Sequence, residues 1–167
     1  MIRAAKLDAS LYEEVEHDRT ATGQAIVVVV IYSLAPAIGG MLHGGALALA
    51  FTTIAALIGW VAWAALTYLI GTRLLPEPQT EADLGEMLRS TAFATAPGAI
   101  GVLGLIPIPG IREISLLAAL IWTLIAMVIA VRQALDYKST GRALGVCLIA
   151  LSVVLILAWH PFVGTAH

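Results

Sequence analysis

Five long apolar runs without a charged side chain constrain this sequence more than any other feature. They occupy residues 22–38, 46–70, 90–107, 114–131 and 143–159. A helix that crosses a membrane needs about 20 mostly apolar residues. The chain is 60% hydrophobic and only 12% charged, whereas soluble domains have about 45–50% apolar and about 25% charged residues. The sequence therefore predicts an all-α integral membrane protein, a bundle of five transmembrane helices.

These runs divide the chain into three parts. Residues 1–20 form a cytoplasmic N-terminal segment, residues 21–163 form the five-span membrane domain, and residues 164–167 form a tail. In the first segment Leu7, Leu11 and Val15 recur at helical spacing, and Ser10 with Glu13 has the spacing of a capping box. We therefore expect a short amphipathic helix there, which could lie along the membrane surface.

The basic residues predict the orientation, because cytoplasmic loops retain Lys and Arg. With five spans, eight of the nine basic residues fall on the side of the N-terminus, and only Arg112 falls on the other side. We expect a cytoplasmic N-terminus and an external C-terminus. The eight residues are Arg3, Lys6, Arg19, Arg73, Arg89, Arg132, Lys138 and Arg142.

The absence of ionisable residues from the runs, and of catalytic motifs from the sequence, argues against several classes of function. No Asp, Glu, Lys, Arg or His lies within a run, whereas proton-coupled pumps place such groups on their pathway. No activated nucleophile, zinc-protease motif or nucleotide loop occurs. The net charge of -2 gives no nucleic-acid footprint. We expect no enzyme activity, no cofactor and no nucleic-acid partner.

The third run, "TAFATAPGAIGVLGLIPIPG", combines membrane-like hydrophobicity with helix breakers. Pro97 interrupts the helical hydrogen bonds, Gly98, Gly101 and Gly104 form a stripe of small residues, and Pro107 closes the run. We expect a kinked helix packed closely among its neighbours. The alternative is a transporter or lipid scramblase in which this helix lines a path for a neutral solute or a lipid headgroup. That path would collect the polar side chains of Gln24, Ser33, Thr91 and Thr95.

A metal site is not predicted. His43, Glu113 and His160 share the external side, and such residue types can bind zinc, but no two of them have ligand spacing within one element. They remain weak candidates.

The cytoplasmic side carries charges of both signs next to the membrane. Glu13, Glu16 and Asp18 precede the first span, and Arg132, Asp136 and Arg142 flank the fourth loop, with Arg132 and Asp136 expected on one helix face. These six residues form either an interaction surface or solvated loop charges that contribute about 0–1 kcal/mol per pair. Membrane lipids and a cytoplasmic protein are the expected partners. Gly141 and Gly145 also permit a homo-oligomer.

Three segments resemble the Yip-one domain family, whose eukaryotic members bind Rab-type GTPases. These are "LYEEVEHDRTATGQA", "RSTAFATAPGAIGVLGLIP" and "LIWTLIAMVIAVRQALDYKSTGRALGV". The resemblance implies five spans, a cytoplasmic N-terminus and, for this short type, a bacterial cytoplasmic membrane. Eukaryotic members have a long cytoplasmic N-terminal region where this chain has "SLYEEVE". The resemblance therefore does not imply that this chain binds Rab-type GTPases. The expected function is that of a non-enzymatic membrane adaptor or organising scaffold.

Overall fold

Helices account for the regular structure of this chain. The computed structural model describes residues 2–106 and 108–163, with the side chains of all of these except 16, 35–44 and 158–163. No strand occurs in this part of the chain, so the predicted all-α class is confirmed. The elements are α1 (Ile2–Ala5), α2 (Ala9–His17), η1 (Arg19–Ala21), α3 (Thr22–Leu69), η2 (Ile70–Leu74), α4 (Leu84–Ala94), η3 (Ala96–Leu105), α5 (Ile111–Ala134) and α6 (Thr140–Val163).

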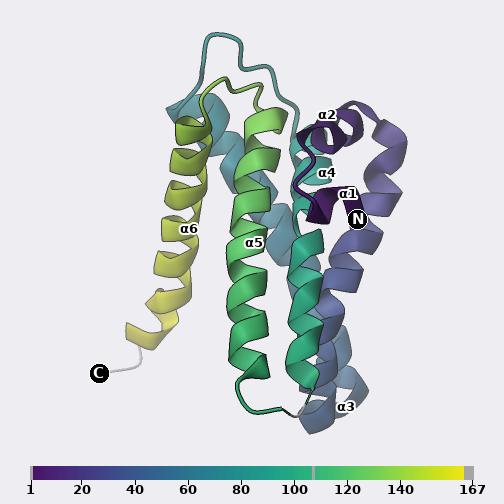
Figure 1. Ribbon diagram of the computed structural model, residues 1–167. Helices are drawn as coiled ribbons and strands as arrows, with labels where there is room; N and C mark the ends of the chain where they lie inside the picture. Colours follow the sequence, from purple (N-terminus) through teal and green to yellow (C-terminus); the bar gives the residue numbers. More distant parts are fainter. Residues whose placement is uncertain (1, 107, 164–167) are drawn as a thin grey trace.

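The first two predicted runs are halves of one helix, α3, which kinks at Gly45. This residue has φ 63° and ψ -158°, a conformation that only glycine adopts readily. The first half of α3 leads away from the N-terminal helices and the second half returns toward the same end (Figure 1). The chain then descends through α4 and η3, ascends through α5 and descends through α6.

This path gathers α2, residues 75–83 and residues 135–139 at one end of the molecule, while α1 lies further along the bundle, against α4 and η3 (Figure 1). We call the end with α2 the charged end. The kink at Gly45 and the connection between η3 and α5 lie at the opposite end.

Within the described residues, three helices are long and apolar enough to cross a membrane: Gly45–Leu74, Ile111–Ala134 and Thr140–Leu157. They overlap the predicted second, fourth and fifth spans. Large apolar side chains on them are exposed, including Leu47 and Phe51, as expected for surfaces that face lipid. The prediction of an integral membrane protein is therefore confirmed. The first run contains a shorter apolar helix, Arg19–Leu34, and the count of five spans stays a prediction.

The third run is not one bent α-helix. It consists of α4 and then η3, a 3-10 helix of 10 residues, although 3-10 runs longer than about 3–4 residues are uncommon. The change of helix type occurs where Pro97 provides no N–H donor. Next to it, the Thr95 hydroxyl donates to the Ala92 carbonyl at 2.7 Å.

The glycine stripe in η3 packs closely at two of its three positions. A methyl group at Gly98 would overlap the Tyr32 ring and lie 3.0 Å from the Thr123 hydroxyl. One at Gly104 would lie 3.0 Å from the Ser115 hydroxyl, whereas one at Gly101 would meet its nearest atoms only at 3.8 Å or more. Close packing of this segment therefore depends on Gly98 and Gly104. Pro107 lies outside the described residues.

Candidate functional site

The N-terminal helix α2 packs against the helical bundle. Its N-cap is Asp8, whose side chain accepts a hydrogen bond from the Ser10 amide at 3.1 Å, so the capping box predicted at Ser10 was wrong. Leu11, Tyr12 and Val15 on one side of α2 are buried in a cluster with residues of α3, α4 and α5. This apolar face is therefore covered by protein.

A buried arginine of α4 fixes the position of α2. Arg89 is 5% exposed, and its Nε donates to the Val15 carbonyl of α2 at 2.8 Å. Such a bond offsets the penalty of burying both groups. From the sequence, Arg89 was predicted only to be one of the cytoplasmic basic residues. Nothing near it in the chain indicates a partner in α2.

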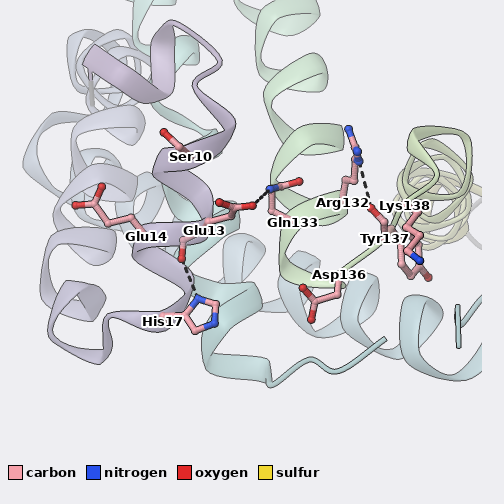
Figure 2. Close-up of a pocket in the computed structure, with 9 residues that line it drawn as sticks. All are labelled: Ser10, Glu13, Glu14, His17, Arg132, Gln133, Asp136, Tyr137 and Lys138. Carbon is pink, nitrogen blue, oxygen red and sulfur yellow. Dashed lines mark hydrogen bonds between the residues drawn. The ribbon is translucent and has the colours of Figure 1, made fainter. Parts of the chain in front are cut away.

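A groove of about 710 Å³ lies between α2 and the end of α5 (Figure 2). We call it the α2–α5 groove. The Gln133 side-chain amide of α5 donates to Glu13 Oε1 of α2 at 3.0 Å and joins the two walls. The lining residues are Ser10, Glu13, Glu14, His17, Arg132, Gln133, Asp136, Tyr137 and Lys138.

The end of α5 differs from the prediction that Arg132 and Asp136 share one helix face. The helix ends at Ala134, and Asp136 has φ 53° in the left-handed region. The Asp136 amide donates to the Gln133 carbonyl and the Tyr137 amide to the Arg132 carbonyl, the pairing of a Schellman C-cap. Arg132 and Asp136 therefore point in different directions (Figure 2).

Within the described part of the chain, Arg132, Lys138 and Asp136 of the groove lack a complete set of partners. Arg132 uses only its Nε, which donates to the Tyr137 carbonyl at 3.2 Å. Among the described residues, the Arg132 Nη groups, the Lys138 ammonium and the Asp136 carboxylate form no hydrogen bond or ion pair. The groove thus presents both signs of charge to a ligand.

The pKa of Asp136 is raised above its ordinary value. Burial is the main cause; the negative charges of Glu81 and Glu13 add to it, and His17 opposes it. A carboxylate with a raised pKa lowers the stability of the folded state whenever it is ionised.

We expect Asp136→Asn to stabilise the protein at neutral pH, because Asn tolerates the left-handed conformation and removes the unfavourable charge. The gain over the wild type should shrink as the pH falls through the raised folded pKa toward the unfolded value of about 3.8, because wild-type Asp136 then becomes neutral. Thermal denaturation at several pH values measures this difference. A less stable variant at neutral pH would contradict the assignment.

A second charged cluster ties residues 75–83 to the start of α6. The Glu77 side chain is 7% exposed and accepts hydrogen bonds from the Lys138 amide at 3.0 Å and the Ser139 amide at 3.3 Å. Arg142 Nε lies 3.7 Å from Glu77 Oε1, and Arg142 Nη1 donates to the Pro76 carbonyl at 2.8 Å. Glu77 was not among the predicted site residues, because its partners are about sixty residues away in the chain.

These contacts lower the pKa of Glu77, with the bond from the Lys138 amide as the largest cause. A depressed pKa stabilises the fold above the unfolded value of 4.5, and this contribution is lost as the pH falls through the folded pKa. Glu77→Gln should therefore lower the melting temperature at pH 7 and converge on the wild type in acid. Glu81→Gln, at an exposed position in the same connection, is the matched control. An equal loss in both variants would contradict this role.

The six predicted surface residues are distributed over several places. Glu13, Arg132 and Asp136 line the groove, whereas Arg142 belongs to the Glu77 cluster. Asp18 caps η1 by accepting a hydrogen bond from the Thr20 amide at 2.8 Å. The Glu16 side chain lies outside the described residues.

The hydroxyl groups expected to line a transport path bond within their own helical segments. Ser33 donates to the Val30 carbonyl, Thr91 to the Met87 carbonyl and Thr95 to the Ala92 carbonyl, at 2.6–2.7 Å. Gln24 is exposed on α3. These contacts therefore do not support a transport path along the third run.

The weak metal candidates are not assembled by the described residues. Glu113 lies exposed in the first turn of α5, and the side chains of His43 and His160 lie outside the described part. Within that part, no three metal-binding side chains form a group.

Gly141 and Gly145 were predicted to permit self-association. Gly145 already faces Leu75 of the same chain, so one of these two positions is partly occupied.

Comparison with known proteins gives one match. A family model described as the Yip1 domain matches residues 9–160. No curated protein and no solved structure matches the chain. The matched range starts at α2 and extends into α6, and therefore includes every residue that lines the groove and the whole third run.

Proposed function

Because the chain belongs to the Yip1 domain family, as its sequence resemblance predicted, we propose that it acts as a non-enzymatic membrane adaptor or organising scaffold. Its charged end holds a protein partner at the membrane surface. By the distribution of basic residues this end faces the cytoplasm, in a bacterial cytoplasmic membrane.

The observation that carries this proposal is the α2–α5 groove. Arg89 of α4 fixes α2 through the Val15 carbonyl, and the bond between Gln133 and Glu13 joins the two walls. Arg132, Lys138 and Asp136 still have polar groups available. A fixed surface that presents both signs of charge can select the partner and its orientation.

A five-span arrangement is consistent with this proposal. Residues 19–34 and the α4–η3 segment would be the remaining two passes. In α4 the residues from Arg89 to Ala94 are all buried, so this half of the segment packs mainly against protein, whereas Val102, Leu103 and Leu105 in η3 are exposed. Helix breakers are tolerated in a membrane when neighbouring helices surround them.

The proposal is tested by photo-crosslinking in the cells that make the protein. A photoreactive amino acid at Glu14 or Lys138, both of which line the groove, should give a protein adduct of defined mass. The same residue at Leu155, which is 60% exposed on α6, serves as a lipid-facing control. Absence of an adduct, or the same adduct from Leu155, would contradict the adaptor function.

A further inference from the structure

We propose that the α2–α5 groove binds the headgroup of a phospholipid that carries both a phosphate and a primary ammonium group. Arg132 and Lys138 bind the phosphate, and Asp136 and Glu13 bind the ammonium. This inference rests on the proposed function in one respect, since both require the groove to be open to a ligand at the membrane surface.

The basic side of the groove suits a phosphate. The two Nη groups of Arg132 have no partner among the described residues, although its Nε is held by the Tyr137 carbonyl. The Lys138 backbone is fixed by Glu77 through its amide, while its ammonium has no partner in that part of the chain. Guanidinium and ammonium groups are the usual protein ligands of phosphate oxygens.

The acidic side of the groove excludes a simple anion and suits an ammonium. The Asp136 carboxylate accepts no hydrogen bond from the described residues, and Glu13 uses only Oε1, with Gln133. An anion alone would be repelled by these carboxylates, and a cation alone by Arg132 and Lys138. A ligand with both charges satisfies both the basic and the acidic groups of the groove, and N–H donors match the unbonded carboxylate oxygens.

The position of the groove favours a lipid as the source of this headgroup. The candidate span Ile111–Ala134 ends two residues before Asp136, so the groove lies at the level expected for headgroups. Leu117, Ile121 and Leu124 are exposed on α5. Arg132 lies on the same helix face two turns beyond Leu124, and Val128 between them is partly buried against the cluster that contains Val131 and Leu135. Acyl chains along this face would lead to the basic side of the groove.

The test is calorimetric titration of the full-length, detergent-solubilised chain with dihexanoyl phospholipids. Phosphatidylethanolamine should bind more tightly than phosphatidylcholine, which has no N–H donor, and than phosphatidylglycerol, which has no ammonium. Lys138→Gln should weaken phosphatidylethanolamine binding about tenfold, as expected for loss of a charge-assisted hydrogen bond. Arg73→Gln removes the same charge at an exposed position outside the groove lining and should leave binding unchanged.

Asp136→Asn gives the most specific result. It should weaken phosphatidylethanolamine binding and strengthen phosphatidylglycerol binding, because it removes the partner of the ammonium and a repulsive charge at the same time. Equal binding of the three lipids, or binding that Lys138→Gln and Asp136→Asn leave unchanged, would overturn the proposal. Free phosphoethanolamine binding as tightly as the lipid would overturn the lipid source.

The two proposals fail separately. Loss of lipid selectivity with retained protein adducts at Glu14 removes only the headgroup site. Lipid selectivity without protein adducts removes only the adaptor function.

Discussion

Replacing Tyr12 by alanine is expected to destabilise the docking of α1 and α2 by about 3–5 kcal/mol, the usual loss for a large buried aromatic side chain. Tyr12 is fully buried and belongs to the same cluster as Phe93 of α4 and Ala126 and Ala130 of α5. Among the described side chains of α2, no other is as large and as deeply buried. Hydrogen exchange of residues 2–18 in lipid nanodiscs measures the effect, which should be an accelerated exchange of these amides with little change in α5.

Tyr12→Phe is the control for this prediction. It removes only the hydroxyl, which donates to the Ala4 carbonyl at 3.5 Å, and a bond of that length contributes little. Exchange in the N-terminal helices should stay close to the wild type. If phenylalanine and alanine accelerated exchange equally, the packing assigned to the ring would be wrong.

Gly98→Ala is expected to destabilise the bundle by about 1–3 kcal/mol through overpacking. The added methyl group would overlap the Tyr32 ring of α3 and press on Thr123 of α5, so three helical segments would have to separate. Thermal denaturation followed by circular dichroism measures the loss.

The same change at Gly101 is the matched control. Its methyl group would contact Ala119 and Leu116 at 3.8–3.9 Å, which is ordinary van der Waals packing. We expect no loss of stability, or a small gain from reduced freedom of the unfolded chain. If the two alanine variants had the same stability, the third run would not pack as described.

The helical class and membrane character were predictable because they depend on the composition of long segments. Uncharged runs of sufficient length require helices in a membrane, whatever their neighbours are. The form of the third run was less predictable. Pro97 indicates an interruption, but the run itself carries no signal for the packing of its glycines against Tyr32 and Ser115, which belong to other helices.

The candidate site was predictable only in part. The charge pattern identified Glu13, Arg132 and Asp136, which line the groove. The prediction that Arg132 and Asp136 share one helix face was wrong, because α5 ends at Ala134 and Asp136 has a left-handed conformation. Arg89 and Glu77 were missed because each bonds to backbone groups far away in the chain. Spacing within one element carries no signal for such contacts.

Docking of α2 against α5 is the central claim, and crosslinking within the membrane tests it most directly. Cysteines at Glu13 and Gln133, whose side chains bond at 3.0 Å, are introduced after replacement of the one native cysteine, Cys147. A short bifunctional maleimide should then join them within one chain, whereas cysteines at Glu13 and Arg112, at the opposite end of α5, should not be joined. Absence of an intrachain crosslink at Glu13 and Gln133, or equal crosslinking of both pairs, would show that the N-terminal helix does not form the groove.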